Sequence, residues 1–283
     1  MEIIFSGESR LKVSYFTTTM ATLFPSSKCI SSAFSKGART YDQNAGIQRS
    51  ILKKIAAKLP RKNLHGPWID LGSGTGLLET MLNGPQIKIP MLCVDLAQEP
   101  LKMLAKQNNR PNIWRVQADI DTLPFKPGIF SLAVLSSVIQ WLPDPAQSLS
   151  RAGALLSKEG RLLFSYFCKG TFAELFALRT EKGLPLPVAL LGGNSIRGLV
   201  EKSGLKIIEL EMFAQKSYFT SAWDILKNIS AIGASAIAGP RLSKRQLILL
   251  CEEYEHRFKT KRGVPVSYTV ALGQAKKGPS HGT

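Results

Sequence analysis

A buried apolar segment that runs directly into alternating glycines constrains this chain more than any other feature. Residues 68–76 read WIDLGSGTG, with Gly72, Gly74 and Gly76 at every second position. Three glycines in five residues cost backbone entropy, so the pattern is favoured where the chain turns tightly or where another molecule lies against the backbone. In an open parallel sheet, ligands bind beyond the carboxyl ends of the strands. The stretch therefore predicts a ligand-binding turn after the first strand of such a sheet.

Short apolar runs alternate with segments of helical spacing along the rest of the chain. We expect strands at 68–71, 91–96, 113–119, 130–137, 161–167, 205–213 and 266–275. We expect helices at 33–59, 77–83, 100–108 and 146–156, and helical insertions near 172–200 and 221–260. This alternation predicts an α/β fold with a doubly wound, mostly parallel seven-stranded sheet, with the two insertions as a lid over its carboxyl-end crevice. Residues 1–32 are expected to be a poorly ordered extension to a domain at 33–283.

The net charge limits the classes of partner. The chain has 37 Lys and Arg against 20 Asp and Glu, a formal charge of +17, which favours nucleic acid, an anionic membrane or an acidic protein. No uncharged apolar run reaches 18 residues, so we expect no transmembrane helix. The four cysteines lie far apart with no CxxC and no clustered histidines, which argues against disulfides or a metal site. We expect a cytoplasmic protein.

Carboxylates follow the ends of the first three predicted strands. Asp95 can accept hydrogen bonds from both hydroxyl groups of a ribose, and Asp119 from the exocyclic amine of adenine. Asp70 precedes the glycines and can hold the loop amides or meet an ammonium group. S-adenosylmethionine carries all of these groups, whereas three carboxylates disfavour the phosphates of a dinucleotide. The spacing GxGxG, rather than GxGxxG, further suggests that all three glycines crowd the turn and let a bulky ligand approach.

The motifs also resemble those of a known family. WIDLGSGTG, CVDLA and QADIDTLPF resemble the class I S-adenosylmethionine-dependent methyltransferases, which have a Rossmann-like fold, although Ser73 stands where a cysteine is usual. Longer stretches between Ala33 and Lys277, including SSVIQWLPDPAQSL and ILKNISAIGAS, resemble the malonyl-acyl-carrier-protein O-methyltransferases of biotin synthesis. The resemblance implies this cofactor-binding set: Asp70, Gly72, Ser73, Gly74, Gly76, Asp95, Leu96, Asp119, Ile120 and Ser136.

The resemblance also implies the reaction. The free carboxylate of a malonyl group, carried on acyl carrier protein or on coenzyme A, becomes a methyl ester early in pimeloyl and biotin synthesis. A carboxylate with a pKa of roughly 3.5 is already ionised near neutrality. It attacks the sulfonium methyl in line without a general base, so we assign no catalytic base.

Candidate contacts to substrate and carrier follow from the same motifs. Tyr41 can bind the carboxylate, cover the cofactor or simply pack as a buried ring, and Gln140 and Trp141 follow the fourth strand, where Trp141 can form an apolar wall or core. Arg39, Arg151 and Arg197 are candidates for a bidentate carboxylate contact, each with a solvated surface role as the alternative. The carrier-docking candidates in the second helical insertion are Lys227, Arg241, Lys244 and Arg245.

Two other activities remain open from the residues alone. An RNA methyltransferase would account for the charge, but SSVIQWLPDP lacks the Asn/Asp-Pro-Pro-aromatic stretch of base-amine enzymes, and no Pro-Cys occurs. We therefore expect no nucleic-acid partner and no membrane partner. An aconitate-type methyltransferase of small carboxylic acids shares fold and chemistry. The remaining alternative is a protein that is not an enzyme and keeps the cofactor pocket as a scaffold or regulatory site.

Overall fold

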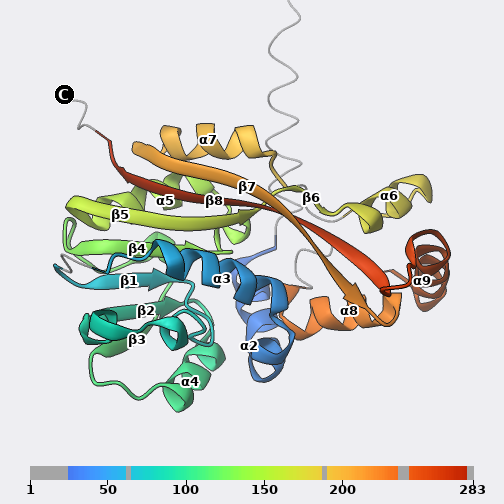
Figure 1. Ribbon diagram of the computed structural model, residues 1–283, viewed down its shortest axis with the longest axis horizontal. Coiled ribbons are helices and arrows are strands. Elements are labelled where there is room, and N and C mark those ends of the chain that lie inside the picture. Colours follow the sequence, from blue (N-terminus) through green and yellow to red (C-terminus); the bar gives the residue numbers. More distant parts are fainter. Residues whose placement is uncertain (1–24, 62–64, 187–189, 235–241, 279–283) are drawn as a thin grey trace, which may run out of the picture.

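A seven-stranded sheet organises the computed structural model, which describes residues 25–61, 65–186, 190–234 and 242–278 (Figure 1). The strand order is β3-β2-β1-β4-β5-β8-β7, and only β8 runs antiparallel to its neighbours. The strands are β1 (Trp68–Leu71), β2 (Met91–Asp95), β3 (Ile113–Gln117), β4 (Phe130–Ser136), β5 (Leu156–Phe167), β7 (Leu205–Phe219) and β8 (Val264–Lys277). The predicted doubly wound, mostly parallel sheet is confirmed.

Eight helices are described, some covering the two faces of this sheet and others lying beside it. They are α2 (Ser27–Asn44), α3 (Gly46–Lys58), α4 (Gln98–Gln107), α5 (Pro145–Leu155), α6 (Ala173–Glu181), α7 (Gly193–Lys202), α8 (Ala222–Ala231) and α9 (Lys244–Phe258). Successive strand residues enter different cores, as strand geometry requires: Trp68 packs in the cluster that contains α3 and α4, and Ile69 in the cluster that contains α5 and α7. Within the described residues, no helix is long and apolar enough to cross a bilayer.

The amino-terminal region differs from the expectation. Helix α2 begins at Ser27, where the side chain of Ser26 accepts a hydrogen bond from the Cys29 N–H at 3.3 Å. Residues 27–32 are therefore helical rather than part of a poorly ordered extension; residues 1–24 lie outside the described part of the chain. The single helix expected at 33–59 is two helices, because Ala45, with φ −81° and ψ 45°, leaves the helical conformation between them.

The segment after the glycine loop also differs. Instead of a helix at 77–83, the chain forms turns and a 3₁₀ helix, η1 (Glu79–Met81), followed by η2 (Gly84–Lys88). Gly84 has φ +53° and is followed by a proline, so the segment ends after seven residues. A helix that short has too few hydrogen bonds to offset the cost of nucleation.

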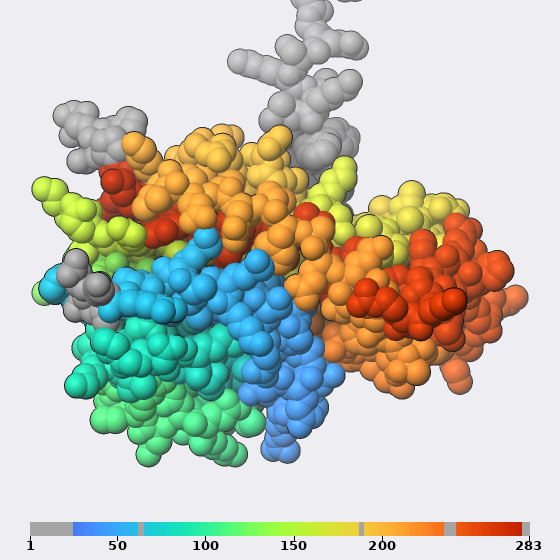
Figure 2. Space-filling view, viewed as in Figure 1, coloured from blue at the N-terminus to red at the C-terminus, as the bar shows by residue number. Residues whose placement is uncertain are grey.

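The helical insertions are divided between two places. Helices α6, α8 and α9 pack together as a lobe beside the sheet domain, with α2 filling the angle between them (Figure 2). Helix α7 instead packs on β7 and α5, as part of the layer that covers the sheet. From the sequence, the residues of α7 are expected in the lid, because the spacing of apolar residues does not distinguish a helix that connects two strands from an inserted helix.

A close contact between β5 and β8 tests this packing. Gly273 is paired with Phe164, and a Cβ at Gly273 would lie 2.2 Å from the Phe164 ring, which is fully buried. We expect Gly273→Ala to lower the free energy of unfolding by about 1–3 kcal/mol through overpacking. Gly198→Ala in α7, where a Cβ meets nothing within 4 Å, should be neutral or stabilise by up to about 1 kcal/mol. Urea denaturation measures both, and an equal effect at the two positions would contradict this packing.

Candidate active site

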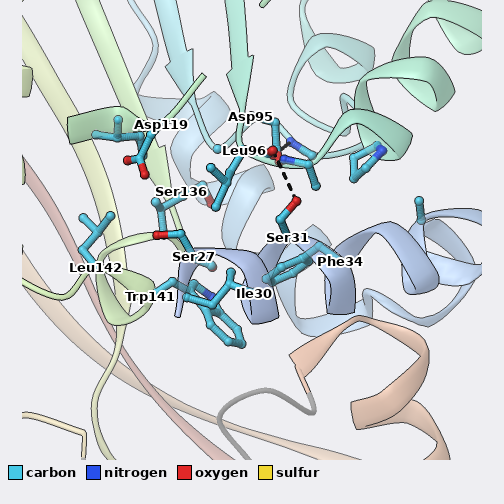
Figure 3. A pocket seen from close by; sticks show the side chains of 18 of the residues that line it. Ser27, Ile30, Ser31, Phe34, Asp95, Leu96, Asp119, Ser136, Trp141 and Leu142 are labelled. Carbon is cyan, nitrogen blue, oxygen red and sulfur yellow. Dashed lines mark hydrogen bonds between the residues drawn. The ribbon is translucent and has the colours of Figure 1, made fainter. Parts of the chain in front are cut away.

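The carboxyl ends of β1, β2, β3 and β4 open into a hollow of about 930 Å³ (Figure 3). Asp95 and Asp119 stand on its strand side, and the side chains of α2 face them across the hollow (Figure 3). We call this space the nucleoside hollow.

The three glycines of the loop have different roles. All have left-handed backbones, with φ of +78° at Gly72, +57° at Gly74 and +87° at Gly76. A Cβ at Gly72 would lie 2.4 Å from Val138, and one at Gly76 would lie 2.1 Å from Leu104 of α4. At Gly74 a Cβ meets nothing within 4 Å. The expectation that all three glycines make room for a ligand is therefore wrong for Gly76, which lines none of the described pockets and serves packing.

Asp95 ties the glycine loop to the end of β2. Its two carboxylate oxygens accept hydrogen bonds from the backbone N–H groups of Gly74 and Ala97, both at 2.8 Å. Burial raises the pKa of Asp95, and these two hydrogen bonds oppose that rise. Each oxygen accepts one of these hydrogen bonds and keeps a further lone pair, as hydrogen bonding to a diol requires. Asp95, rather than Asp70, holds the loop amide.

Asp119 lies two residues beyond β3. One of its oxygens accepts from the Asp121 N–H at 3.0 Å, which leaves the other without a partner among the described residues. Leu96 and Ile120 line the hollow beside the two aspartates, and Ser136 lines it from the end of β4. The fold thus brings these predicted residues together around one space.

Five lining residues from α2, Ala38 among them, were not predicted. Ser27, Ile30, Ser31 and Phe34 face the strand ends, and the Ser31 hydroxyl donates to the Leu96 carbonyl at 3.4 Å (Figure 3). The apolar spacing of Ile30, Phe34 and, further on, Tyr41 continues the helical pattern upstream of residue 33. This spacing was the signal that could have found them.

A smaller pocket lies beneath the glycine loop. Asp70, Ser73 and Gln48 line it, and the Ser73 hydroxyl is buried without a hydrogen-bond partner. Burial, followed by the neighbouring Glu79 carboxylate, raises the pKa of Asp70 well above its usual value. Burial also raises the pKa of Glu79, although the thiol of Cys93 donates to it at 3.0 Å.

A second large space, which we call the acyl chamber, adjoins the nucleoside hollow. It encloses about 820 Å³ between the end of β5 and the lobe helices. Tyr41 and Trp141 line both spaces, and the rings of Phe34 and Trp141 stack edge to face at 4.9 Å. Gln140 lines the chamber, and its Nε2 donates to the Ser137 carbonyl at 2.7 Å. The substrate candidates Tyr41, Gln140 and Trp141 therefore lie at or beside the junction.

Most of the remaining described lining of the acyl chamber is apolar or aromatic. Phe167, Phe172, Leu175, Phe176 and Ile229 are among its residues, and none of the described residues that line it carries a charge. Ser137 marks the junction with a left-handed backbone, φ +59°, that is rare for a residue other than glycine. Its N–H donates to the Ser165 hydroxyl at 2.8 Å, which supports this conformation.

The three candidate arginines lie elsewhere. Arg151 of α5 is 3.0 Å from Asp121, Arg197 of α7 is 3.7 Å from Glu201, and Arg39 is on the exposed side of α2. None of them lines a described pocket, so the structure does not support an arginine clamp. Helix periodicity decides this: α2 turns Ala38 and Tyr41, rather than Arg39, towards the hollow.

The buried Asp70–Glu79 pair predicts a pH dependence of stability. Because the folded-state pKa of Asp70 is raised, the native state holds a proton that the unfolded chain releases, and stability falls as pH rises from about 4 through the folded pKa. We expect the cofactor-free Asp70→Asn variant to gain roughly 1 kcal/mol or more relative to wild type between about pH 5 and pH 8.

Urea denaturation at both pH values measures this difference. Glu99→Gln is the control: Lys102 lowers the pKa of the exposed Glu99, so its titration ends below this pH range. A pH-independent difference between wild type and Asp70→Asn would contradict the raised pKa.

Comparisons with known proteins agree with this geometry. The chain is 29% identical over 269 residues to the malonyl-[acyl-carrier protein] O-methyltransferase of Geobacter sulfurreducens, covering 88% of this chain and 98% of that protein. It is 27% identical to the biotin biosynthesis bifunctional protein BioHC of Cellvibrio japonicus, covering 90% of this chain and 51% of that protein.

A solved structure shares the fold. Phosphoethanolamine N-methyltransferase 2 of Haemonchus contortus, in complex with S-adenosyl-L-methionine, superposes with a TM-score of 0.54 at 16% identity, covering 86% of this chain and 57% of that one. Residues 43–210 match the family model of a methyltransferase domain. Because that match spans more than half of the 283 residues, the chain belongs to this methyltransferase domain family.

Proposed function

We propose that this protein methylates the free carboxylate of malonyl-acyl carrier protein, with S-adenosylmethionine as methyl donor. The names of relatives that align with nearly the whole chain support the reaction, and the bifunctional relative supports a place in biotin synthesis. All four cysteines are free thiols, which fits a reducing compartment, so we propose the cytoplasm as its location.

The polar groups of the nucleoside hollow fit this cofactor. Asp95 has lone pairs for two ribose hydroxyls, Asp119 has a free oxygen for an adenine amine, and Leu96 and Ile120 offer apolar surface to the base. Beneath the loop, the unpaired Ser73 hydroxyl lies in the pocket that suits the methionine end. When bound, the cofactor supplies an electrophilic methyl group on a positively charged sulfur.

The choice of substrate rests on the absence of charged side chains among the described residues that line the acyl chamber. Aconitate has three carboxylates, and burying them without cationic partners would be costly. A malonyl thioester has one carboxylate and an otherwise neutral chain, which suits aromatic and aliphatic walls. An RNA phosphate backbone would meet the same difficulty as aconitate.

The residues of the junction position the reaction rather than transfer protons. Phe34 and Trp141 stack together between the two spaces and exclude water, which strengthens a carboxylate as nucleophile. The Ser165–Ser137–Gln140 hydrogen bonds hold the turn after β4 rigid at this point. Burial raises the pKa of Tyr41, so its hydroxyl remains a donor at neutral pH. Orientation of this kind can contribute a large part of a rate enhancement.

A pair of exposed cations on the lobe suits an acidic carrier protein. Lys244 and Arg245 are exposed in the first turn of α9, which contains no acidic residue. The positive end of the helix dipole repels cations at a helix N-terminus. An acidic partner bound there would offset that repulsion. Lys227 projects from α8, whose Ile229 lines the chamber, although Lys227 also pairs with Asp224 at 3.1 Å. Arg241 lies outside the described residues.

The activity is tested with purified protein and labelled S-adenosylmethionine. We expect methyl transfer to malonyl-acyl carrier protein, with the methyl ester identified by mass spectrometry, and slower transfer to malonyl-coenzyme A. Aconitate and transfer RNA are the competing acceptors. Labelling of either one in preference to both malonyl thioesters would overturn the proposal.

Charge reversal tests the docking surface. We expect Lys244→Glu combined with Arg245→Glu to raise KM for malonyl-acyl carrier protein about tenfold at low salt, since rim charges act chiefly on association, and to change KM for malonyl-coenzyme A much less. Added salt should reduce the difference. Lys126→Glu with Lys158→Glu, both exposed and close in sequence to the amino ends of β4 and β5, makes the same change in net charge. If this control pair has the same effect, the surface is not a specific docking site.

A further inference from the structure

Gln48 lies between the two spaces that the ligands need. It is the third residue of α3, and it lines both the acyl chamber and the small pocket beneath the glycine loop. The residue is 9% exposed. A side chain in this place can touch a group of the substrate that approaches the cofactor.

The amide of Gln48 has no hydrogen-bond partner among the residues that the structure describes. Its Oε1 is buried without a hydrogen bond, and its Nε2 makes none to any described residue. A buried amide without partners costs free energy, and such exceptions in native structures are often places where a ligand binds. Gln86, by contrast, is buried with both ends of its amide bonded, to Pro60 and Asn83.

Two other polar side chains of the acyl chamber are already hydrogen-bonded to the backbone. Nε2 of Gln140 is engaged by the Ser137 carbonyl at 2.7 Å, and the Thr171 hydroxyl both donates to and accepts from the backbone of Thr269. Gln48 Nε2 has two N–H groups to offer. No side chain caps the N-terminus of α3, so the positive end of the helix dipole lies in the same turn.

The methionine carboxylate of the cofactor has other donors. The N–H groups of Thr75 and Leu77 in the small pocket make no hydrogen bond to a described residue, and the Ser73 hydroxyl is unpaired. Gln48 is therefore not required to hold it.

We propose that the Gln48 amide binds the substrate carboxylate and orients it towards the methyl group. This inference rests on the proposed function and replaces the arginine clamp with a neutral donor. An arginine would bind the anion more strongly, but a charge-assisted hydrogen bond would also withdraw electron density from the attacking oxygen. A neutral amide fixes the direction of the carboxylate and leaves it more nucleophilic, while the cofactor's positive sulfur provides the counter-charge.

The test separates the carboxylate from the rest of the substrate. Binding to the protein with S-adenosylhomocysteine, which cannot react, is measured by calorimetry for malonyl-acyl carrier protein and for its methyl ester. We expect Gln48→Met to weaken malonyl binding about tenfold, the loss of a hydrogen bond to a charged group, and to change methyl ester binding less than about twofold. Gln48→Glu should weaken malonyl binding further through repulsion. Gln86→Met controls for the loss of a buried amide.

Each alternative has its own result. Weaker binding of S-adenosylhomocysteine itself to Gln48→Met would assign the amide to the methionine carboxylate and overturn the inference. Equal effects on acid and ester would show a role in packing and overturn it as well. If wild-type protein binds neither malonyl-acyl carrier protein nor its methyl ester, the proposed function is wrong and so is the inference that rests on it. If wild type binds both and the Gln48 variants behave as wild type, only the inference fails.

Discussion

The active-site architecture depends on one carboxylate at the end of β2. By accepting backbone hydrogen bonds from Gly74 and Ala97, Asp95 joins the glycine turn after β1 to the turn after β2. The left-handed conformations of the loop are permitted because its glycines have no Cβ, and they are maintained because Gly72 and Gly76 pack against Val138 and Leu104. The nucleoside hollow is the space that this arrangement leaves open.

The nucleoside hollow and the acyl chamber differ in the charge of their lining, and each suits the ligand expected there. Acidic groups stand around the nucleoside hollow, where a cationic ligand is expected, whereas the described lining of the acyl chamber is uncharged. The excess of Lys and Arg lies outside these spaces, and part of it is on the exposed first turn of α9. A buried cation in the chamber would have to be desolvated, whereas a cation on the surface attracts an acidic carrier without that cost.

Site residues at the ends of strands could be predicted from the sequence. Site residues on helices could not, because their positions depend on how each helix is oriented. Asp95, Asp119, Leu96 and Ile120 meet because parallel strands place their carboxyl ends at one edge, which the alternation of elements already implies. Arg39 and Arg151 take the surface position that was the alternative to a carboxylate contact, since a residue's direction from a helix depends on how that helix is rotated against the sheet. Ile30 and Ser31 were missed because the helix that carries them begins earlier than its composition suggests.

The sequence by itself determined the sheet, its order of elements and the ligand-binding turn, because the periods of apolar residues and the positions of glycine are local properties of the chain. Only the tertiary structure decided that α2 closes the nucleoside hollow, that α7 covers the sheet while α6, α8 and α9 enclose the acyl chamber, and that Gln48 lies between the two spaces. Those outcomes depend on close contacts between distant segments, such as Gly37 of α2 against Ala231 and Gly233 beyond it. Contacts of that kind are set by the packing of complementary surfaces, which no local pattern encodes.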